Sequence, residues 1–458
     1  MKGCVIRMEK NIFREYDIRG NYPTQINEDV AFTVGKSYGS YLQEKFNQNT
    51  CVVSHDNRLS SNSLTLSLIE GITSSGCNVI YYGLTTTPMN FYERYINNLF
   101  GIMVTASHNP KDDNGFKFSF DHLSNARGIQ ITDFRDYTLN GVFKSGLGTI
   151  IENDITQSYI DFLKQGVSFG DKKRKVIIDC GNGVTCTIAR KIFNEFNIDF
   201  EIINEENDGT FPNHHPDPAV KENMRQLQEA VLKSHADLGI AYDGDGDRIG
   251  CVKEDGTILS TEEFMIIIIR DLINKVNNKT FLYDVKCSKS LEDEIIKLGG
   301  NPLMYRTGAS YTQAKTKEDN LAFGGEFSGH IFFRDRIPDM GSAIYNSLRL
   351  CEILSKTDKT VSELCGGINK YFATEEIKIP TTDERKFAVV DKIKNFCEQQ
   401  NFEIITIDGV RVKFENGWAL VRASNTGPNL IFRAEASTTE DLDKLKNYFE
   451  KLINDYNK

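Results

Sequence analysis

The sequence predicts several α/β domains, in which helices pack on sheets whose strands alternate with them along the chain. Apolar runs with strand character, such as Ile102–Thr105 and Leu238–Tyr242, alternate with helical patterns over the first three quarters of the chain. Before the second run, Met224, Leu227 and Val231 follow spacings of three and four and form one apolar helix face. The chain has 458 residues, well beyond the roughly 250–300 at which a single hydrophobic core stops growing. We therefore expect more than one domain.

Clusters of glycine and polar residues mark three candidate breaks between these domains. They lie near residues 146–148, 255–256 and 366–367. They divide the chain into four segments of ordinary domain size, which are residues 1–150, 151–256, 257–367 and 368–458. The sequence has no short-period repeat and no low-complexity tract, so we expect neither a solenoid nor long linkers.

Composition excludes several classes of function. The formal net charge is −10, whereas non-specific binding of nucleic acid or of an anionic membrane needs a basic surface. The longest purely apolar run, Phe264–Ile269, is far shorter than the roughly 20 residues that span a bilayer. Residues Met1–Glu9 lack the apolar region of a secretory signal, so we expect a cytoplasmic protein. The ten cysteines form no C-x-x-C pair, which favours free thiols over a zinc ribbon or a redox dithiol.

A first candidate functional segment, Thr105–Pro110, follows an apolar strand and reads Thr-Ala-Ser-His-Asn-Pro. Pro110 fixes its own φ and restrains Asn109 to extended conformations, so the segment is a stiff turn that can present the hydroxyl of Ser107. Serine and asparagine are also common in ordinary turns and helix caps. The segment alone therefore does not distinguish a functional serine from an ordinary turn or helix cap.

A second segment places Asp243, Asp245 and Asp247 at alternate positions directly after an apolar strand, with glycine between them. Glycine lets the backbone curl, so that three carboxylates can converge on one cation. Ligands that are all oxygen atoms favour Mg²⁺, Mn²⁺ or Ca²⁺ over zinc, and Mg²⁺ is the expected ion if phosphate is the substrate. The pattern predicts a metal site.

Two other interpretations of the aspartates were weighed. A calcium-binding EF-hand loop that began at Asp243 would have Glu254 at its twelfth position, as required, but its sixth position needs glycine and holds Arg248. The flanking segments also have strand patterns rather than helical ones. A plain acidic surface turn is the other alternative, although three neighbouring carboxylates repel one another unless a cation joins them.

A third segment, Gly324–His330, carries a carboxylate, a hydroxyl and an imidazole at Glu326, Ser328 and His330. In an extended segment these alternate side chains would point the same way. Such groups suit sugar hydroxyls and proton transfer, although a single histidine is more often a hydrogen-bonded structural residue.

A fourth segment, Arg422–Pro428, gathers a guanidinium, two hydroxyls, an amide and a flexible backbone within seven residues. These are the groups that bind a phosphate. An ordinary polar turn before the strand expected at Asn429–Phe432 is the alternative.

Together and in this order, the four segments resemble the α-D-phosphohexomutase superfamily, most closely its bifunctional phosphomannomutase/phosphoglucomutase branch. The resemblance runs almost from end to end. It includes four further stretches, which are Phe13–Gly20, Asn114–Lys117, Asp284–Ser288 and Asp408–Val412.

The resemblance implies a fold and a reaction. The expected fold is three related α/β domains and a smaller α+β C-terminal domain around a central cleft. The expected reaction interconverts hexose 1-phosphate and hexose 6-phosphate, of mannose, glucose or both, through phospho-Ser107 and a hexose 1,6-bisphosphate intermediate. Mg²⁺ is the implied metal and glucose 1,6-bisphosphate the implied activator. Hexose phosphates are the expected partners, without nucleic acid or membrane, and the chain is expected to be a monomer or a homodimer.

The resemblance also assigns roles to individual residues. The implied catalytic residues are Ser107, His330, Lys117, Arg19 and Arg248. The implied metal ligands are Ser107, Asp243, Asp245 and Asp247. The implied substrate-binding residues are Tyr16, Lys286, Glu326 and Ser328, together with a phosphate clamp made of Arg422, Ser424, Asn425 and Thr426.

Two departures from the family pattern bear on sugar preference rather than on the chemistry. Ala309 stands where the bifunctional enzymes usually have a histidine that contacts substrate, and Ile337–Gly341 is less acidic and less glycine-rich than expected. Phe327 argues against the phosphoglucosamine branch, where glutamine usually occupies this place.

Two rival functions would each explain part of this pattern. A metal-dependent phosphatase has no use for the clamp, and an inactive sugar-phosphate-binding protein does not need the catalytic residues that this sequence keeps.

Overall fold

The computed structural model describes residues 8–122, 124–425 and 427–458. The chain forms two compact units. The first unit extends to Ser260 and also includes Ser328–Leu364, and the second contains Thr261–Phe327 and Cys365–Lys458. Among the helices of the described ranges, none combines the length and the apolar character needed to cross a membrane.

The first unit begins with a six-stranded sheet whose central strands are parallel. The strand order is β1-β5-β4-β2-β3-β6. The strands are β1 (Ile18–Asn21), β2 (Thr50–His55), β3 (Asn78–Leu84), β4 (Phe100–Val104), β5 (Asp113–Phe118) and β6 (Ile150–Glu152). Strand β2 pairs in parallel with β3 and β4, whereas β5 runs antiparallel to β4 and β1. A short helix, η1 (Lys10–Ile12), precedes the sheet.

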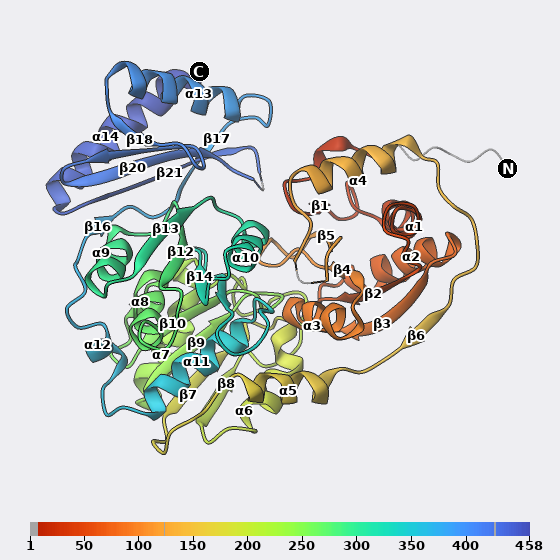
Figure 1. The fold of residues 1–458 in the computed structure, drawn as a ribbon, viewed down its shortest axis with the longest axis horizontal. Helices are drawn as coiled ribbons and strands as arrows, with labels where there is room; N and C mark the ends of the chain where they lie inside the picture. Colours follow the sequence, from red (N-terminus) through yellow and green to blue (C-terminus); the bar gives the residue numbers. More distant parts are fainter. Residues whose placement is uncertain (1–7, 123, 426) are drawn as a thin grey trace. The chain divides into compact units, whose positions relative to one another are not determined.

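Four helices pack on this sheet, namely α1 (Glu28–Lys45), α2 (Ser61–Ser74), α3 (Thr87–Asn97) and α4 (Ile129–Asn140). Figure 1 shows α1 and α2 lying side by side. Their close contact depends on small residues, because a Cβ atom at Gly35 would lie 2.1 Å from the Leu68 carbonyl oxygen. Tyr38, Phe118 and Phe134 form an aromatic cluster in the core beneath these helices.

The first unit continues with a second sheet of five strands in the order β11-β10-β9-β7-β8. The strands are β7 (Lys175–Asp179), β8 (Asp199–Ile203), β9 (Leu238–Tyr242), β10 (Ile249–Lys253) and β11 (Ile258–Leu259). Strand β7 is parallel to β8 and β9, and β9 and β10 form an antiparallel hairpin. The remaining elements of the unit are α5 (Thr156–Gln165), η2 (Val184–Thr187), α6 (Ala189–Phe193), η3 (Lys221–Met224), α7 (Arg225–Ser234), β15 (Ile331–Phe333), α11 (Ala343–Ser355) and α12 (Val361–Leu364).

The apolar helix face predicted from the sequence forms as expected. Leu227 and Val231 lie on α7, and Met224 ends the preceding η3. All three are buried in a cluster that includes Ile177 of β7 and Ala241 of β9. Because of this apolar face, α7 packs against the second sheet. Strand β9 of that sheet leads into the aspartate segment.

The second unit contains a parallel three-stranded arrangement with helices and a separate antiparallel sheet. The parallel strands are β12 (Thr280–Asp284), β13 (Asn301–Tyr305) and β14 (Phe323–Gly325), with β12 between the other two. Their helices are α8 (Thr261–Leu272), α9 (Lys289–Lys297) and α10 (Ala309–Glu318). The polypeptide alternates strand and helix here, as the sequence predicts.

The C-terminal part of the second unit is the antiparallel sheet. Its strands are β16 (Phe372–Ala373), β17 (Ile377–Pro380), β18 (Glu403–Ile405), β19 (Val410–Phe414), β20 (Gly417–Ala423) and β21 (Asn429–Ala436). Two helices, α13 (Lys386–Gln399) and α14 (Thr439–Tyr456), lie on one face of this sheet (Figure 1). Their apolar sides share a core with the sheet that includes Ile393, Phe432 and Phe449. The α/β class and the smaller α+β C-terminal part are thus confirmed.

Candidate active site

Ser107 lies in the turn between β4 and β5, at the end of a buried strand. Its backbone is left-handed, with φ 53°, a conformation uncommon for residues other than glycine. The Ser107 amide donates to Thr105 Oγ1 at 2.8 Å, and the Ser107 hydroxyl donates to Asp243 Oδ2 at 2.7 Å. The side chain is buried. The turn therefore presents this hydroxyl, as the sequence predicts, and aims it at the aspartate segment.

The aspartate segment connects β9 to β10 and folds around Asp243. One oxygen of this carboxylate, Oδ1, accepts hydrogen bonds from the amides of Gly246, Asp247 and Arg248 at 3.0–3.1 Å. Gly246 has φ 79°, which favours glycine. A Cβ atom at position 244 would lie 2.5 Å from the Ser107 carbonyl oxygen, so glycine there lets the two turns come together.

The three aspartates converge, as predicted for a metal site. One ligand atom from each of Asp243, Asp245 and Asp247 lies within 4.8 Å of the others, and all three residues are buried. Lys117 Nζ binds Asp245 Oδ2 at 2.6 Å and Asp247 Oδ2 at 2.7 Å. Asp245 Oδ1 is buried and has no hydrogen-bond partner among the described residues. A buried carboxylate oxygen without a partner is what a divalent cation would bind, so the donor set fits Mg²⁺.

The electrostatics of this cluster indicate a shortage of positive charge. Burial and the carboxylates of Asp247 and Asp245 together raise the pKa of Asp243 well above its usual range. Burial also opposes ionisation of Asp247, but Lys117 and His330 outweigh it and hold that pKa well below its usual range. Burial would lower the pKa of Lys117, yet the two aspartates that it contacts raise it. A further positive charge would therefore relieve the repulsion at Asp243.

His330 and Arg248 lie beside the aspartates. His330 Nε2 is 3.2 Å from Asp247 Oδ1, and His330 Nδ1 is 3.0 Å from Ser328 Oγ. Arg248 Nε lies 3.4 Å from His330 Nε2 and 4.0 Å from Asp243 Oδ2. The imidazole is thus held between a carboxylate and a hydroxyl, an arrangement in which it can take or give a proton.

The prediction that Glu326, Ser328 and His330 share one face of an extended segment is wrong. Strand β14 ends at Gly325, and residues 327–329 form a turn. Gly329 has φ 90°, and a Cβ atom there would lie 2.5 Å from the Ile249 carbonyl oxygen. The glycine lets the chain bend, and the bend removes the two-residue periodicity on which the prediction rested.

Arg19 and Tyr16 lie near the same turn and loop. Arg19 is buried, binds Asp17 Oδ2 at 2.7 Å and donates to Asn109 Oδ1 at 3.0 Å. Asn109 belongs to the turn that carries Ser107. Burial lowers the pKa of Arg248, but nearby acidic groups, with Tyr16 among them, outweigh this effect and raise it. Five of the predicted positions in the first unit are therefore cationic or polar groups gathered around Ser107 and the aspartates, namely Tyr16, Arg19, Lys117, Arg248 and His330.

In the second unit, the positive charges of Lys286 and Arg422 both act on the carboxylate of Glu376. Lys286 Nζ binds Glu376 Oε2 at 2.8 Å and lies 5.3 Å from the centre of the Phe327 ring. The charge of Lys286, reinforced by that of Arg422, lowers the pKa of Glu376 to about 2 despite its burial. Arg422 also binds Asp408 Oδ2 through Nε at 3.0 Å. This is a cationic pair of the kind that can bind a phosphate.

Of the predicted clamp, Arg422 lies on β20, and Ser424 and Asn425 follow the end of that strand. Lys386, which is buried on α13, donates to the carbonyl oxygens of Ser424 at 2.8 Å and Gly427 at 3.2 Å. Asn425 Nδ2 is buried and makes no hydrogen bond within the described part of the chain. The predicted contact Thr426 falls outside the described residues. Lys386 thus holds the backbone at Ser424 and Gly427, while the side-chain amide of Asn425 has no acceptor within the described residues.

Glu326 has a local structural role at the start of α10. Its Oε1 accepts from the Gly308 amide at 2.5 Å and from Thr312 Oγ1 at 3.1 Å. Ala309, the residue that departs from the family pattern, is the first residue of this helix. A carboxylate at a helix N-terminus is stabilised by the helix dipole, so Glu326 supports the segment in which Ala309 lies.

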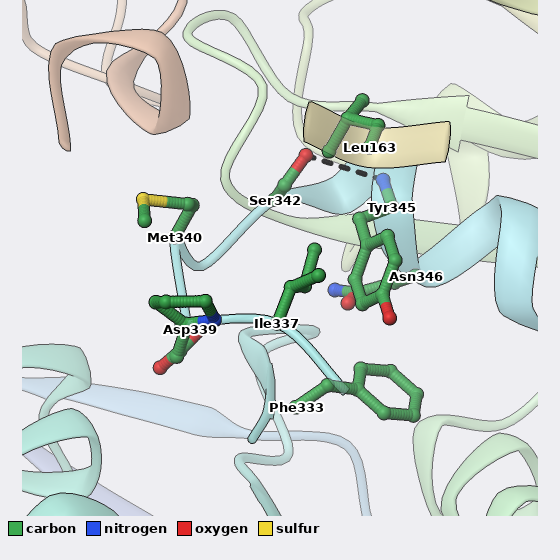
Figure 2. Close-up of a pocket in the computed structure, with 9 residues that line it drawn as sticks. Leu163, Phe333, Ile337, Asp339, Met340, Ser342, Tyr345 and Asn346 are labelled. Carbon is green, nitrogen blue, oxygen red and sulfur yellow. Dashed lines mark hydrogen bonds between the residues drawn. The ribbon is translucent and has the colours of Figure 1, made fainter. Parts of the chain in front are cut away.

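The second departure, Ile337–Gly341, winds around a small pocket in the first unit (Figure 2). Ile337, Asp339 and Met340 line it together with Phe333 and Tyr345. The Asp339 carboxylate accepts from the Gly341 amide at 2.7 Å and so closes the turn. The apolar residues of this stretch face other residues of the first unit. This agrees with a stretch that is less acidic than the family pattern.

Several residues that shape the site carried no recognisable sequence signal. Arg58 and Asp56 lie beneath the Ser107 turn and bond to it, and Thr87 donates to Asp245 Oδ2 at 2.6 Å. These contacts join segments that are far apart in the sequence, and many go to backbone atoms. A motif search does not reveal such contacts.

Comparison with known proteins places this geometry in a family. Four models of the phosphoglucomutase/phosphomannomutase family match in order. They describe α/β/α domain I at residues 10–134, domain II at 157–256, domain III at 260–371 and the C-terminal domain at 376–452.

Individual relatives match over nearly the whole chain. A phosphomannomutase/phosphoglucomutase of Pseudomonas aeruginosa is 37% identical over 97% of this chain and 95% of that protein. A phosphoglucomutase of Neisseria meningitidis is 34% identical over 97% of each. The crystal structure of a phosphoglucomutase/phosphomannomutase family protein from Burkholderia thailandensis superposes with a TM-score of 0.90 at 30% identity, covering 98% of both chains. The chain therefore belongs to the phosphoglucomutase/phosphomannomutase family.

Proposed function

We propose that the chain is a phosphohexomutase that interconverts the 1- and 6-phosphates of glucose, mannose or both, with Ser107 as the phosphoryl carrier. One observation carries the proposal. A buried serine hydroxyl lies 2.7 Å from Asp243, one of three converging carboxylates, with Lys117 bound to the other two. Membership of the family supports the reaction class, that of an intramolecular phosphotransferase.

In the proposed reaction, the free hydroxyl oxygen of the bound sugar phosphate attacks the phosphorus atom of phospho-Ser107. The bond between phosphorus and Ser107 Oγ breaks, and a hexose 1,6-bisphosphate forms. The proton of the sugar hydroxyl passes to a base, and we propose His330 for this role because its Nε2 lies 3.2 Å from Asp247 Oδ1, a carboxylate that can stabilise the protonated imidazole. The intermediate then reverses its orientation and returns its other phosphate to Ser107.

Phosphoryl transfer depends mainly on positioning and on charge neutralisation. Lys117, Arg248 and Arg19 supply positive charge near Ser107. Asp243, Asp245, Asp247 and an oxygen on Ser107 would hold Mg²⁺, which when bound would neutralise charge on the transferring phosphoryl group. The partnerless Asp245 Oδ1 supports this metal site.

We also propose roles in substrate binding. Arg422, Ser424, Asn425 and Thr426 are proposed to bind the phosphate that is not reacting, and Lys286 and Tyr16 to assist. Glu326 and Ser328 are proposed to contact sugar hydroxyls. Lys286 and Arg422 together lower the pKa of Glu376, so both charges act on one anionic group. This supports an anion site, because a substrate phosphate would meet the same two cations.

The proposal also includes an activator, domain boundaries and a cellular location. Glucose 1,6-bisphosphate is proposed to activate the enzyme by phosphorylating Ser107. The domain boundaries are proposed near residues 150, 256 and 367, where glycine and polar residues cluster in the sequence. The scattered cysteines and phosphorylated substrates favour the cytoplasm as the place of action.

The test is incubation with glucose 1-phosphate and, separately, mannose 1-phosphate. A mutase yields the 6-phosphate, a phosphatase yields inorganic phosphate and an inactive binding protein yields neither. We expect the 6-phosphate from at least one sugar, and the kcat/KM values of the two will give the preference. Release of inorganic phosphate as the main product would overturn the proposal.

A further inference from the structure

Three backbone carbonyl groups of the turn that carries Ser107, and that of the first residue of β5, accept hydrogen bonds from one side chain, that of Arg58. Nη2 of Arg58 donates to the carbonyl oxygens of Ser107 and Asn109, each at 2.7 Å. Nη1 donates to those of Pro110 at 2.5 Å and Asp113 at 3.1 Å. One guanidinium group therefore connects most of the turn from the inside.

Arg58 is itself held rigidly. Its side chain is completely buried, and Nε binds Asp56 Oδ2 at 3.2 Å. The guanidinium lies over the Phe211 ring at 5.4 Å from its centre. Asp56 Oδ2 also accepts from Thr105 Oγ1 at 2.7 Å, and Thr105 Oγ1 in turn accepts from the Ser107 amide at 2.8 Å. Arg58 and Asp56 thus reach both sides of the Ser107 peptide unit.

Such a support is needed because of the conformation of Ser107. A left-handed serine is strained and persists only where its surroundings impose that conformation. The planar guanidinium has five N–H donors in a fixed fork, whereas a lysine ammonium is a point charge with three donors. Lysine at position 58 would keep the charge but could not hold the four carbonyl groups in this geometry.

We propose that Arg58 is a positioning residue for phosphoryl transfer, which holds Ser107 in the left-handed conformation that aims its hydroxyl at Asp243. This inference rests on the proposed role of Ser107 as phosphoryl carrier. Arg58 contacts no reacting atom and acts through the backbone of the turn. Its loss therefore slows phosphorylation of Ser107 without weakening the capture of substrate.

The test compares Arg58→Lys with a matched control, Arg174→Lys. Arg174 also binds an aspartate, Asp237, at 3.0 Å, and also donates to backbone carbonyl oxygens, those of Leu354 at 3.1 Å and Thr357 at 2.5 Å. None of these groups belongs to the Ser107 turn. Both variants lose a guanidinium that supports backbone, so general destabilisation affects both.

The readout is the rate at which dephosphorylated protein gains one phosphate from glucose 1,6-bisphosphate, followed by intact mass, together with kcat and KM. We expect Arg58→Lys to be at least about 10-fold slower in phosphorylation and in kcat, with KM within about 2-fold of wild type. Arg174→Lys should stay within about 2-fold of wild type in all three. Phosphorylation of Arg58→Lys at the rate of the control would overturn the proposal.

A second variant covers the case in which Arg58→Lys does not fold. Asp56→Asn keeps the volume but weakens the hold on Arg58 and Thr105, and we expect phosphorylation to slow by about 3-fold or more. A wild-type rate in Asp56→Asn would then contradict the proposal. Failure of the carrier role itself has a different signature, because the wild type would then gain no phosphate, or Ser107→Ala would gain as much as the wild type.

Discussion

The hydroxyl of Ser107 donates a hydrogen bond to Asp243 Oδ2 across 2.7 Å, although the two residues are 136 positions apart in the sequence. Each comes from a turn at the end of a buried strand, β4 for the serine and β9 for the aspartate. Because the glycine at position 244 lets these turns approach, a hydroxyl and a candidate metal ligand meet in one place. This contact links the proposed phosphoryl carrier to the proposed Mg²⁺ site.

The first prediction concerns the carrier. Ser107→Ala should lower kcat by at least about 1,000-fold while leaving substrate binding largely intact, since only the oxygen that carries the phosphate is lost. The measurements are kcat and the calorimetric affinity for glucose 1-phosphate. Ser119→Ala is the control, because Ser119 is also a buried serine of the first sheet region but its hydroxyl bonds the backbone of Gly101 and not an aspartate. A wild-type rate in the Ser107 variant would disprove the carrier role.

The second prediction concerns the metal. Asp245→Asn should raise the Mg²⁺ concentration needed for half-maximal activity about 10-fold and should lower kcat, because one of three anionic ligands becomes neutral. A Mg²⁺ titration of activity measures both effects. Asp255→Asn is the matched control, since Asp255 bonds Thr257 in an exposed turn of the same unit. Superimposable titration curves for wild type and Asp245→Asn would contradict the metal site.

The third prediction concerns the clamp. Arg422→Ala should raise KM about 10-fold for both the 1-phosphate and the 6-phosphate of the sugar, because each phosphate in turn meets the same donors. Initial rates in the two directions provide the measurement. Lys413→Ala, which removes an exposed ion pair with Glu403 on the same sheet, should leave KM unchanged. An increase for one substrate alone would show that the two phosphate groups bind at different places.

The fourth prediction concerns pH and stability. Burial raises the pKa of Glu93 to about 8, although hydrogen bonds and Arg94 oppose the shift. The folded state therefore binds a proton more tightly than the unfolded state. The stabilisation by Glu93 is fully present below pH about 4.5 and is lost as the pH rises towards 8.

The corresponding experiment is Glu93→Gln, which mimics the protonated side chain. Its free energy of unfolding should equal that of wild type near pH 4 and exceed it at pH 9 by up to about 5 kcal/mol. Denaturant unfolding at the two pH values measures this difference. Glu403→Gln, at an exposed ion pair, should show no such trend. A gap between Glu93→Gln and wild type that does not widen with pH would count against a buried neutral Glu93.

The sequence located the two turns of the phosphoryl-transfer site because each follows an apolar run that ends in polar residues. Ser107 after β4 and Asp243 after β9 lie where the run of strand residues stops. Apolar spacing likewise placed Leu227 and Val231 against the second sheet. Such local patterns survive folding because each element buries its own apolar face.

Other features depend on contacts that no local pattern encodes. The alternation of Glu326 and His330 failed because Gly329 bends the chain against β10, a close approach visible only in three dimensions. Arg58 was missed because its partners are carbonyl oxygens about 50 residues away, and every residue has a carbonyl group. Lys386 escaped notice for the same reason.

The most direct test of the account is the activity of the enzyme without its phosphate. In the proposed mechanism each catalytic cycle begins and ends with phosphate on Ser107, and a monophosphate substrate does not readily supply it. The protein is treated with a phosphatase, loss of one phosphate is confirmed by intact mass, and glucose 1-phosphate turnover is measured with and without a catalytic amount of glucose 1,6-bisphosphate. We expect almost no activity without the bisphosphate and restored activity with it. Full activity of the unphosphorylated protein without the bisphosphate would contradict the phosphoserine mechanism.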